Sequence, residues 1–453
     1  MLEVIRDLGL ELEIIFNKGS VMVLPAGINK ASGLIEAVRS LGLSPHNVVG
    51  VGDAENDHAF LRCCGCAVAV ANALPSLKEA ANAVMKGERG EGVIELVERL
   101  RHAETSLIPP ERHAIPVGKD RDGKEYFIVP QNGSVLIAGS SRIGKSTLAT
   151  ALTEKMSAKK FEFCVFDPEG DYLELENAVP AGSPKIPPNL EEVMKLLGKL
   201  GANTVVNTQA MEIAERPGFF ATLFPQIESV RARTGRPHWL LIDEAHHLLP
   251  ASRGGMEEVL PEKLDAAVFI TVYPDAVAPE ALRMVKTVVA LGPHAKEIIE
   301  TFCKTVGVEP PRELPQPREK EVLVYSVNGE AFTINPERPE QQHRRHIRKY
   351  AVGDLGPERS FYFRGPENAL HLRAQNLMMF LQIAEGVDDR TWEFHRQRGD
   401  YSKWFRNAIK NGELADEAEK IEQDGQLGPK ESRERIKDEV LRRYTAPAQP
   451  DGA

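Results

Sequence analysis

The chain has 453 residues, and its 66 Asp and Glu outnumber its 56 Lys and Arg, so the formal net charge is −10. This length allows about three domains of ordinary size, and the acidic balance excludes a general basic surface for nucleic acid, although not a local basic channel built by several subunits. No apolar run approaches the roughly 20 residues of a membrane-spanning helix and no signal-peptide pattern opens the chain, so we expect a cytoplasmic protein without a membrane partner.

Residues 1–100 alternate short apolar runs with helical patterns, as in VMVLP at 21–25 and ASGLIEAVRSLGL at 31–43. Such alternation is typical of βα units. The charged stretch over 101–116, which contains two consecutive prolines, predicts a linker. We therefore expect a first α/β region over residues 1–100 and a second domain after the linker.

The stretch from Leu24 to Leu74 combines a lysine near its start with the motif GDAEND. Asp53 and Asp57 are carboxylates four residues apart on a predicted strand-to-helix loop, which can hold one hard cation such as Mg²⁺. Lys30, upstream of them, can neutralise phosphoryl oxygens. An Asp-rich turn with a surface lysine is the alternative, and the length of the combined pattern disfavours it.

This stretch resembles the C-terminal half of haloacid dehalogenase (HAD) phosphatases of the Cof or sucrose-phosphatase type. The resemblance implies a partial HAD Rossmann-like region in which Lys30 stabilises the phosphate, Asp53 and Asp57 bind Mg²⁺, and Asn56 supports the metal loop. These phosphatases attack through an Asp in a D-x-D motif that precedes the lysine, and residues 1–29 contain no D-x-D. The covalent route therefore lacks its nucleophile in this sequence.

Two explanations stay open for the missing nucleophile. The region is either a degenerate scaffold or part of a HAD-family phosphomonoester (sugar phosphate) hydrolase truncated at its N-terminus. A HAD sheet without its first strand would leave backbone groups of the neighbouring strands unpaired. We expect that translation upstream of Met1 in the same frame reveals D-x-D-G-[TS] after an apolar strand.

The second domain, predicted over residues 117–334, opens with a hairpin whose turn is Asp-Gly at 122–123. An apolar strand then precedes GSSRIGKS, from Gly139 to Ser146, and a good helix follows it. This is the complete P-loop pattern in its strand–loop–helix context. Backbone amides and the helix N-terminus bind phosphates, Lys145 reaches the β and γ phosphates and assists catalysis, and Ser146 ligates Mg²⁺. The predicted nucleotide-binding residues are Gly139, Ser140, Ser141, Arg142, Ile143, Gly144, Lys145, Ser146 and Thr147.

The segment HWLLIDEAHHLLP supplies the second part of a nucleotide site. Trp239 to Ile242 have the pattern of a buried strand, and ligand sites in open α/β sheets lie at the carboxyl ends of strands. We expect Asp243 to hold Mg²⁺ through its water shell and Glu244 to deprotonate the attacking water. Capping of the next helix is the alternative role for this acidic pair, and the upstream P-loop disfavours it.

Two further strands are predicted to end in polar residues, at Asp167 in FCVFDPEGDYLEL and near Thr271 in AAVFITVYPDAV. Together with the hairpin, the P-loop and the acidic pair, they make residues 115–307 similar to the HerA/FtsK group of P-loop ATPases. In that group a Gln usually follows the sensor Thr, whereas Val272 follows it here. Thr271 can still hydrogen-bond the γ phosphate or the water, so it stays a catalytic candidate.

The same resemblance implies a homo-oligomeric ring in which a neighbour's arginine completes each site. ATP is the expected ligand and Mg²⁺ the expected cofactor, while nucleic acid is an undecided partner. For each candidate arginine, a place on the solvated surface is the alternative. The candidates are Arg231, Arg233, Arg253 and Arg283.

Beyond about residue 335 the composition becomes strongly charged. We predict a linker over 335–355, a small, mainly helical accessory domain over 356–445 and a disordered tail over 446–453. The segment 360–410 resembles a small module found with HAD-type hydrolase fusions in bacteria, and this resemblance implies no activity. Its polar side chains either form an anion-binding or partner surface or belong to ordinary helical packing. They are Arg364, His395, Arg396, Asp400, Trp404 and Arg406.

The sequence thus predicts an α/β protein with a partial HAD Rossmann-like region, a P-loop NTPase with a parallel sheet, and a helical C-terminal domain. The leading function is Mg²⁺-dependent ATP hydrolysis by direct attack of water. The alternatives are a truncated HAD phosphatase regulated by the ATPase, a DNA-translocating motor, and an ATP-dependent switch or scaffold.

Overall fold

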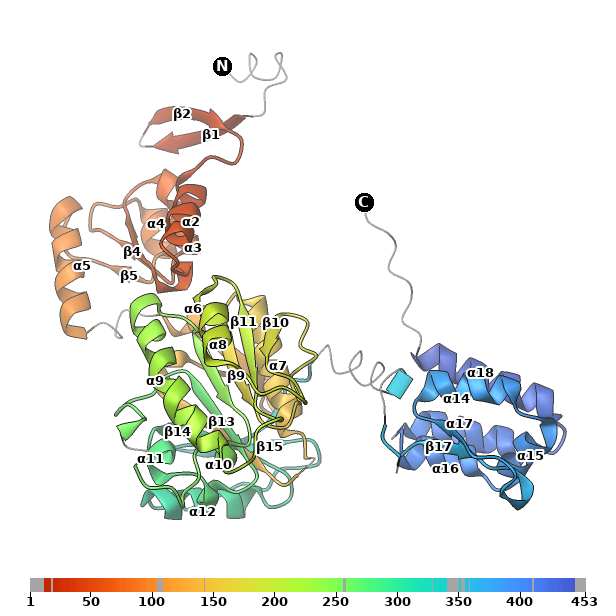
Figure 1. The fold of residues 1–453 in the computed structure, drawn as a ribbon. Helices are drawn as coiled ribbons and strands as arrows, with labels where there is room; N and C mark the ends of the chain where they lie inside the picture. Colours follow the sequence, from red (N-terminus) through yellow and green to blue (C-terminus); the bar gives the residue numbers. More distant parts are fainter. Residues whose placement is uncertain are drawn as a thin grey trace, which may run out of the picture. The chain divides into compact units, whose positions relative to one another are not determined.

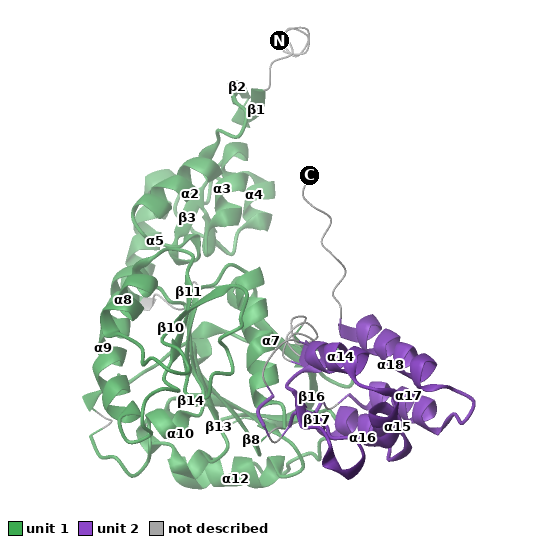
Figure 2. Ribbon diagram, turned by 45° about the vertical axis from the view of Figure 1, so that its right-hand side comes forward, with its two compact units in different colours: residues 1–339 green, residues 340–453 purple. Residues whose placement is uncertain are grey.

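The computed structural model separates into two compact units, residues 1–339 and residues 340–453 (Figure 2). Arg142 and the tail over 446–453, both named above, lie outside the described residues. The structure describes residues 12–17, 19–103, 109–141, 143–255, 258–327, 329–339, 350–351, 355–357, 359–409 and 411–444.

The N-terminal region, residues 12–103, begins with an antiparallel hairpin and continues as a small parallel sheet in the order β3-β4-β5. Its strands are β1 (Leu12–Asn17), β2 (Ser20–Pro25), β3 (Val49–Gly52), β4 (Cys66–Ala69) and β5 (Ala83–Val84). Its helices are α2 (Lys30–Ser40), α3 (His58–Cys63), α4 (Pro75–Ala80) and α5 (Arg89–Ala103), with the 3-10 turns η1 (Pro45–Asn47) and η2 (Glu55–Asp57). The predicted βα alternation is therefore present, and α5 runs on into the range predicted as a linker.

The P-loop domain, residues 115–339, is built on one sheet of eleven strands in the order β10-β11-β9-β12-β13-β8-β14-β15-β16-β6-β7 (Figure 1). The seven strands from β10 to β14 in this order are parallel, and the remaining pairs are antiparallel. The strands are β6 (Ile115–Lys119), β7 (Glu125–Ile128), β8 (Ser134–Gly139), β9 (Phe163–Asp167), β10 (Ala178–Ala181), β11 (Asn203–Asn207), β12 (Trp239–Ile242), β13 (Ala267–Thr271), β14 (Val285–Leu291), β15 (Val322–Ser326) and β16 (Ala331–Pro336). The hairpin predicted before the P-loop is β6–β7.

Helices cover both faces of this sheet, because alternate residues of each central strand enter different cores. In β8, Val135 and Ile137 pack with α7, whereas Leu136 and Ala138 pack with α9 and α12. The helices are α6 (Pro110–His113), α7 (Lys145–Ala158), α8 (Leu190–Gly198), α9 (Arg216–Thr234), α10 (Ala245–Leu248), α11 (Pro279–Arg283) and α12 (Ala295–Val306), with the 3-10 turns η4 (Pro130–Asn132) and η6 (Pro274–Ala276).

The N-terminal region and the P-loop domain meet through buried polar and aromatic contacts. The Arg236 guanidinium, 1% exposed, donates to the Glu162 carboxylate at 2.7 Å and to the Gly42 carbonyl at 2.7 and 3.1 Å. The His46 ring stacks on Phe161, with ring centroids 4.0 Å apart. Because these groups are satisfied only when both parts are in place, the two parts form a single compact unit.

The second unit is a small helical fold around an aromatic core. Its elements are β17 (Phe361–Phe363), η7 (Pro366–Asn368), β18 (Leu372–Ala374), α14 (Leu377–Gly386), α15 (Asp389–Gln397), α16 (Asp400–Asn407), α17 (Gly412–Gln423) and α18 (Pro429–Tyr444). His395 lies 2.8 Å from Asp400 through Nδ1 and accepts the Arg364 backbone N–H through Nε2. Trp404 and Arg396 donate to backbone carbonyls. These side chains are engaged within the fold, which favours helical packing over an anion-binding surface.

Candidate functional site

The P-loop connects the end of β8 to the start of α7 and requires glycine at two points. Gly144 caps α7 with φ 112°, in the left-handed region that favours glycine. A Cβ at Gly139 would lie 3.0 Å from the Leu291 carbonyl oxygen on the neighbouring strand. Lys145 is only 6% exposed, and its ammonium donates to the Ser140 carbonyl at 3.2 Å. The loop is thus folded around its lysine at the carboxyl end of the sheet.

The acidic pair follows β12 at the same end of the sheet. Asp243 is 2% exposed, and burial together with the neighbouring Glu244 raises its pKa well above the usual range. Burial also raises the pKa of Glu244, and the charge of Lys145 opposes that rise, which places the lysine and the acid near each other. Glu244 adopts φ 40° and ψ 53°, a strained conformation for a residue other than glycine.

Polar atoms at this edge are buried without a hydrogen-bond partner. Buried polar groups are nearly always paired, so a cluster of unpaired ones indicates a place that a ligand or water completes. The atoms follow the strands β11 and β12, which lie on either side of β9. They are Asn207 Nδ2, Thr208 Oγ1, Asp243 Oδ1, Glu244 Oε2 and His247 Nδ1.

The segment after β9 is a tight turn organised by one carboxylate. Asp167 accepts the backbone N–H groups of Gly170, Asp171 and Tyr172 at 2.8 to 3.0 Å. The turn buries Tyr172, and burial together with the nearby carboxylate of Asp243 raises the pKa of its phenol well above 10. Asp167 therefore shapes the wall of the site, and Tyr172 adds a buried neutral phenol to it.

Thr271, the predicted sensor, ends β13 beside the acidic pair and is fully buried. Its hydroxyl lies 3.0 Å from His246 Nδ1 and accepts the Tyr273 backbone N–H at 3.1 Å. His246 Nδ1 also lies 3.4 Å from Glu244 Oε2. His246 thus stands between the predicted base and the predicted sensor. The run DEAHH directly after a strand was the signal for it, although a histidine there does not reveal which strand it contacts.

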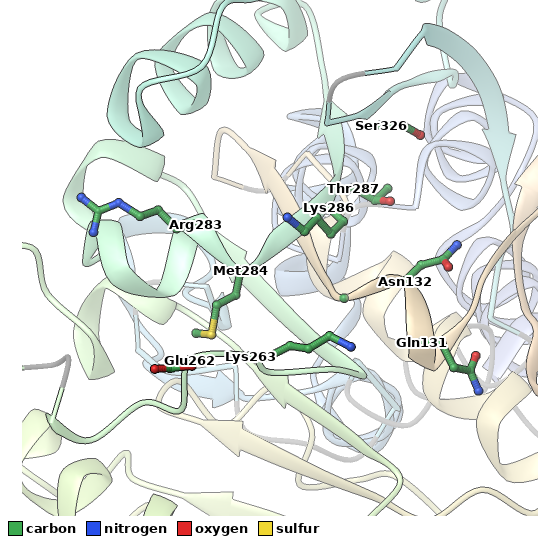
Figure 3. A pocket seen from close by; sticks show the side chains of 10 residues that line it. Gln131, Asn132, Glu262, Lys263, Arg283, Met284, Lys286, Thr287 and Ser326 are labelled. Carbon is green, nitrogen blue, oxygen red and sulfur yellow. The ribbon is translucent and has the colours of Figure 1, made fainter. Parts of the chain in front are cut away.

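The candidate arginines occupy different surroundings. Arg231 donates to the Pro237 and Asp265 carbonyls and to Glu228, so its guanidinium is held within its own chain. Arg283 lies before β14, at the opposite end of the sheet from the P-loop, beside a cavity of about 520 Å³ (Figure 3). That cavity is lined by Gln131, Asn132, Gly133, Glu262, Lys263, Arg283, Met284, Lys286, Thr287 and Ser326.

A second group of predicted site residues lies in the N-terminal region, around a cavity of about 690 Å³ lined by Lys30, Asp53 and Asp57 among others. Lys30 Nζ lies 2.5 Å from Asp57 Oδ1, and Asp57 Oδ2 accepts the backbone N–H groups of Asp53 and Ala54. Burial would raise the pKa of Asp57, but these hydrogen bonds lower it below the usual range. Asn56 Oδ1 is buried without a partner.

The close approach of Asp57 to the strand requires the glycine of this motif. A Cβ at Gly52 would lie 2.6 Å from the Asp57 side chain, closer than real Cβ atoms come to a neighbour. The structure therefore brings together Lys30, Asp53 and Asp57 at the carboxyl end of β3, as the sequence pattern predicts.

No group of three or more His, Cys, Asp or Glu side chains is arranged to hold a metal anywhere in the described ranges. Mg²⁺ keeps several waters and needs only one or two carboxylates, so either acidic pair fits it.

Comparisons with known proteins match the N-terminal region to one family. Residues 8–97 match the model of haloacid dehalogenase-like hydrolases. Phosphoglycolate phosphatase 2 of Saccharolobus solfataricus is 36% identical over 84 residues, 18% of this chain and 36% of the relative. Phosphoglycolate phosphatase of Methanothermobacter thermautotrophicus is 38% identical over 98 residues, 21% of this chain and 43% of the relative. The HAD-like identity of the N-terminal region is confirmed, and the chain spans about two fifths of these relatives.

Among solved structures, the genome packaging NTPase B204 from Sulfolobus turreted icosahedral virus 2, in complex with ATP-gammaS, matches 45% of this chain and 97% of its own, with 16% identity and a TM-score of 0.32. The sucrose-phosphatase from Synechocystis sp. PCC6803, in complex with sucrose and phosphate, matches 22% of this chain and 44% of its own, with 21% identity and a TM-score of 0.19.

In the described part of the chain, no helix combines the length and apolar character needed to cross a membrane.

Proposed function

We propose that the P-loop domain binds ATP with Mg²⁺ and hydrolyses it. The observation that carries this proposal is the edge of the sheet where a buried lysine lies near the buried Asp243 and the partly buried Glu244, whose oxygens Oδ1 and Oε2, respectively, lack partners. A folded chain tolerates such unpaired acids when a ligand completes them.

Each residue has one role in the proposed reaction. The P-loop amides from Gly139 to Thr147 and the N-terminus of α7 bind the phosphates, and Lys145 spans the β and γ phosphates. Ser146 and Asp243 would hold Mg²⁺, which neutralises phosphate charge when bound. Glu244 takes the proton of the attacking water, so that water attacks the γ phosphate directly and no covalent intermediate forms on the chain.

The HAD-like region has a separate role in this proposal. Its relatives are phosphoglycolate phosphatases, and we propose that the region keeps their way of holding Mg²⁺ at Asp53 and Asp57, with Lys30 and Asn56 beside it. Lys30 already satisfies Asp57 in this structure. In this proposal the region also serves as a scaffold that packs against the ATPase domain through Arg236 and His46.

The experiment is a comparison of ATP binding and ATP turnover in the wild type and in Glu244→Gln. The substitution removes the base and keeps its shape, so ATP affinity should stay within about twofold while the turnover rate falls by at least about 100-fold. Turnover at the wild-type rate would show that Glu244 is not the base, and a wild type without Mg²⁺-dependent turnover would refute the proposal.

What the hydrolysis drives is tested by the same assay with and without duplex DNA, alongside the mass of the protein in solution. The resemblance to ring ATPases predicts a homo-oligomer. Stimulation by DNA in a ring-sized species supports a motor. A DNA-independent rate supports a switch or scaffold, with the HAD-like region as its fixed attachment.

A further inference from the structure

The imidazole of His246 lies between two groups of the proposed ATPase site that come from different strands. Its Nδ1 is 3.0 Å from the Thr271 hydroxyl at the end of β13 and 3.4 Å from the Glu244 carboxylate after β12. The ring meets Tyr273 edge-on, with ring centroids 5.8 Å apart. The histidine is therefore fixed from the β13 side and faces the acid on the other.

The contacts around Thr271 favour a proton on Nδ1 of the ring. The Thr271 hydroxyl accepts the Tyr273 backbone N–H, and the Tyr273 carbonyl lies 3.3 Å away as an acceptor for its own proton. A proton on Nδ1 of His246 completes this series of hydrogen bonds, because Nδ1 then donates to the Thr271 hydroxyl. The positive edge of the ring then faces the Glu244 carboxylate. The other tautomer would turn a lone pair toward a carboxylate.

The ring is also neutral at ordinary pH. Burial, followed by the neighbouring His247 and Lys145, lowers the pKa of His246 to about 4. A neutral ring whose Nδ1–H edge lies 3.4 Å from a carboxylate attracts it without neutralising it, so the acid keeps its capacity to accept a proton from water.

We propose that His246 is the positioning residue for the base: it holds the Glu244 carboxylate toward the attacking water and ties the orientation of this carboxylate to the end of β13. This inference rests on the proposed ATPase function. Thr271 is fully buried behind the imidazole and Val272 follows it, so His246 is the side chain from this part of the site that faces the base. Glu244 Oε2 has no hydrogen-bond partner among the described residues, and His246 Nδ1 approaches it to 3.4 Å.

The test is steady-state ATP hydrolysis by the full chain with His246→Leu and His246→Asn. Leu keeps the volume and removes the donor, whereas the Asn amide N–H can take the place of Nδ1–H. Removing the polar contact between Nδ1–H and the charged carboxylate should lower the turnover rate about 10- to 100-fold. We expect that fall for His246→Leu with KM and ATP affinity unchanged, and recovery to within about fivefold for His246→Asn.

Two controls separate positioning from a loss of structure. His102→Leu, at an exposed position near the end of α5, should turn over ATP as the wild type does. In a Glu244→Gln background, His246→Leu should cause no further loss, because the histidine acts through the carboxylate that is already absent.

The inference is overturned if His246→Leu keeps the wild-type turnover rate, if its loss appears in KM and ATP affinity instead, or if His246→Asn is as impaired as His246→Leu. Any of these results with an active wild type leaves the ATPase proposal standing. A wild type that does not hydrolyse ATP would refute both.

Discussion

The two halves of the first unit place a lysine and acidic residues at the carboxyl ends of parallel strands, but they bury the lysine to different depths. In the P-loop domain Lys145 is 6% exposed, and the strands beside it, such as β8 and β12, are buried along their whole length. In the HAD-like region the Lys30 side chain is 50% exposed, and the sheet has three strands. Among the described residues, β3 pairs along one edge only.

This difference changes what the charges do. Where the lysine is exposed, it pairs with its acid, as Lys30 does with the buried Asp57 carboxylate. Where the lysine is buried, as Lys145 is, oxygens of the nearby acids are left unpaired, and charges interact more strongly away from water. The depth at which the lysine lies, more than the residue types, distinguishes the two sites.

The largest effect that tests this comparison comes from the two lysines. Lys145→Ala should abolish detectable ATP binding, a loss of at least about 100-fold in affinity, because it removes the buried ammonium that is expected to contact the phosphates. Lys30→Ala should leave ATP affinity unchanged. Titration calorimetry with ATP and Mg²⁺ on both variants measures this, and equal losses would mean that the two sites are not separate.

The junction between the two regions gives the next effect. Arg236→Ala leaves the buried Glu162 carboxylate without its partner and removes both hydrogen bonds to Gly42. Breaking a buried ion pair in this way should lower the free energy of unfolding by about 3–5 kcal/mol. Arg39→Ala removes a solvent-exposed pair with Glu36 and should change it by less than about 0.5 kcal/mol. Denaturant unfolding of the full chain compares them, and similar values would contradict a structural role for the junction.

A smaller effect should appear as a dependence of stability on pH. Burial lowers the pKa of His238 at this junction to about 3. Because the unfolded histidine takes up a proton near pH 6.5, the stabilisation is complete above that pH and is lost as the pH falls from 6.5 toward 3. One such group changes the free energy of unfolding by at most about 1.4 kcal/mol per pH unit.

His238→Asn isolates that contribution. The Asn oxygen can accept the Glu162 backbone N–H as His238 Nδ1 does, but the side chain does not titrate. The wild type should lose about 1 kcal/mol more than His238→Asn when the pH is lowered from 6 to 5. Parallel stability curves for the two proteins would assign the acid sensitivity to other groups.

Local sequence patterns predicted the strands that carry the P-loop domain's site. β9 ends at Asp167, β12 spans Trp239–Ile242 and β13 ends at Thr271, each as expected from an apolar run that stops at a polar residue. These strands are buried on both faces, so their sequences are continuous apolar runs. The HAD-like region was predictable from a loop motif next to a short apolar strand.

Contacts between distant segments were not predictable. Arg236 was not singled out, because its partner Gly42 is 194 residues away in the sequence. His246 and Thr271 are 25 residues apart, and only the neighbouring positions of β12 and β13 in the sheet bring them together. A pattern along one chain segment cannot give the order of strands in a sheet, and therefore it cannot give these pairs.

The smallest expected effect is an absence of turnover in the HAD-like region. This sequence has no D-x-D before Lys30, so the chain as given lacks a nucleophile for an aspartyl-phosphate intermediate, even with Mg²⁺ held at Asp53 and Asp57. We expect no Mg²⁺-dependent hydrolysis of sugar phosphates or aryl phosphates above that of a blank purified in parallel. Asp53→Ala is the matched variant, because a contaminating phosphatase would be unaffected by it. Turnover in the wild type that disappears in Asp53→Ala would show that the site with the exposed Lys30 supports catalysis, and that the three strands described for this region suffice to activate a phosphate ester.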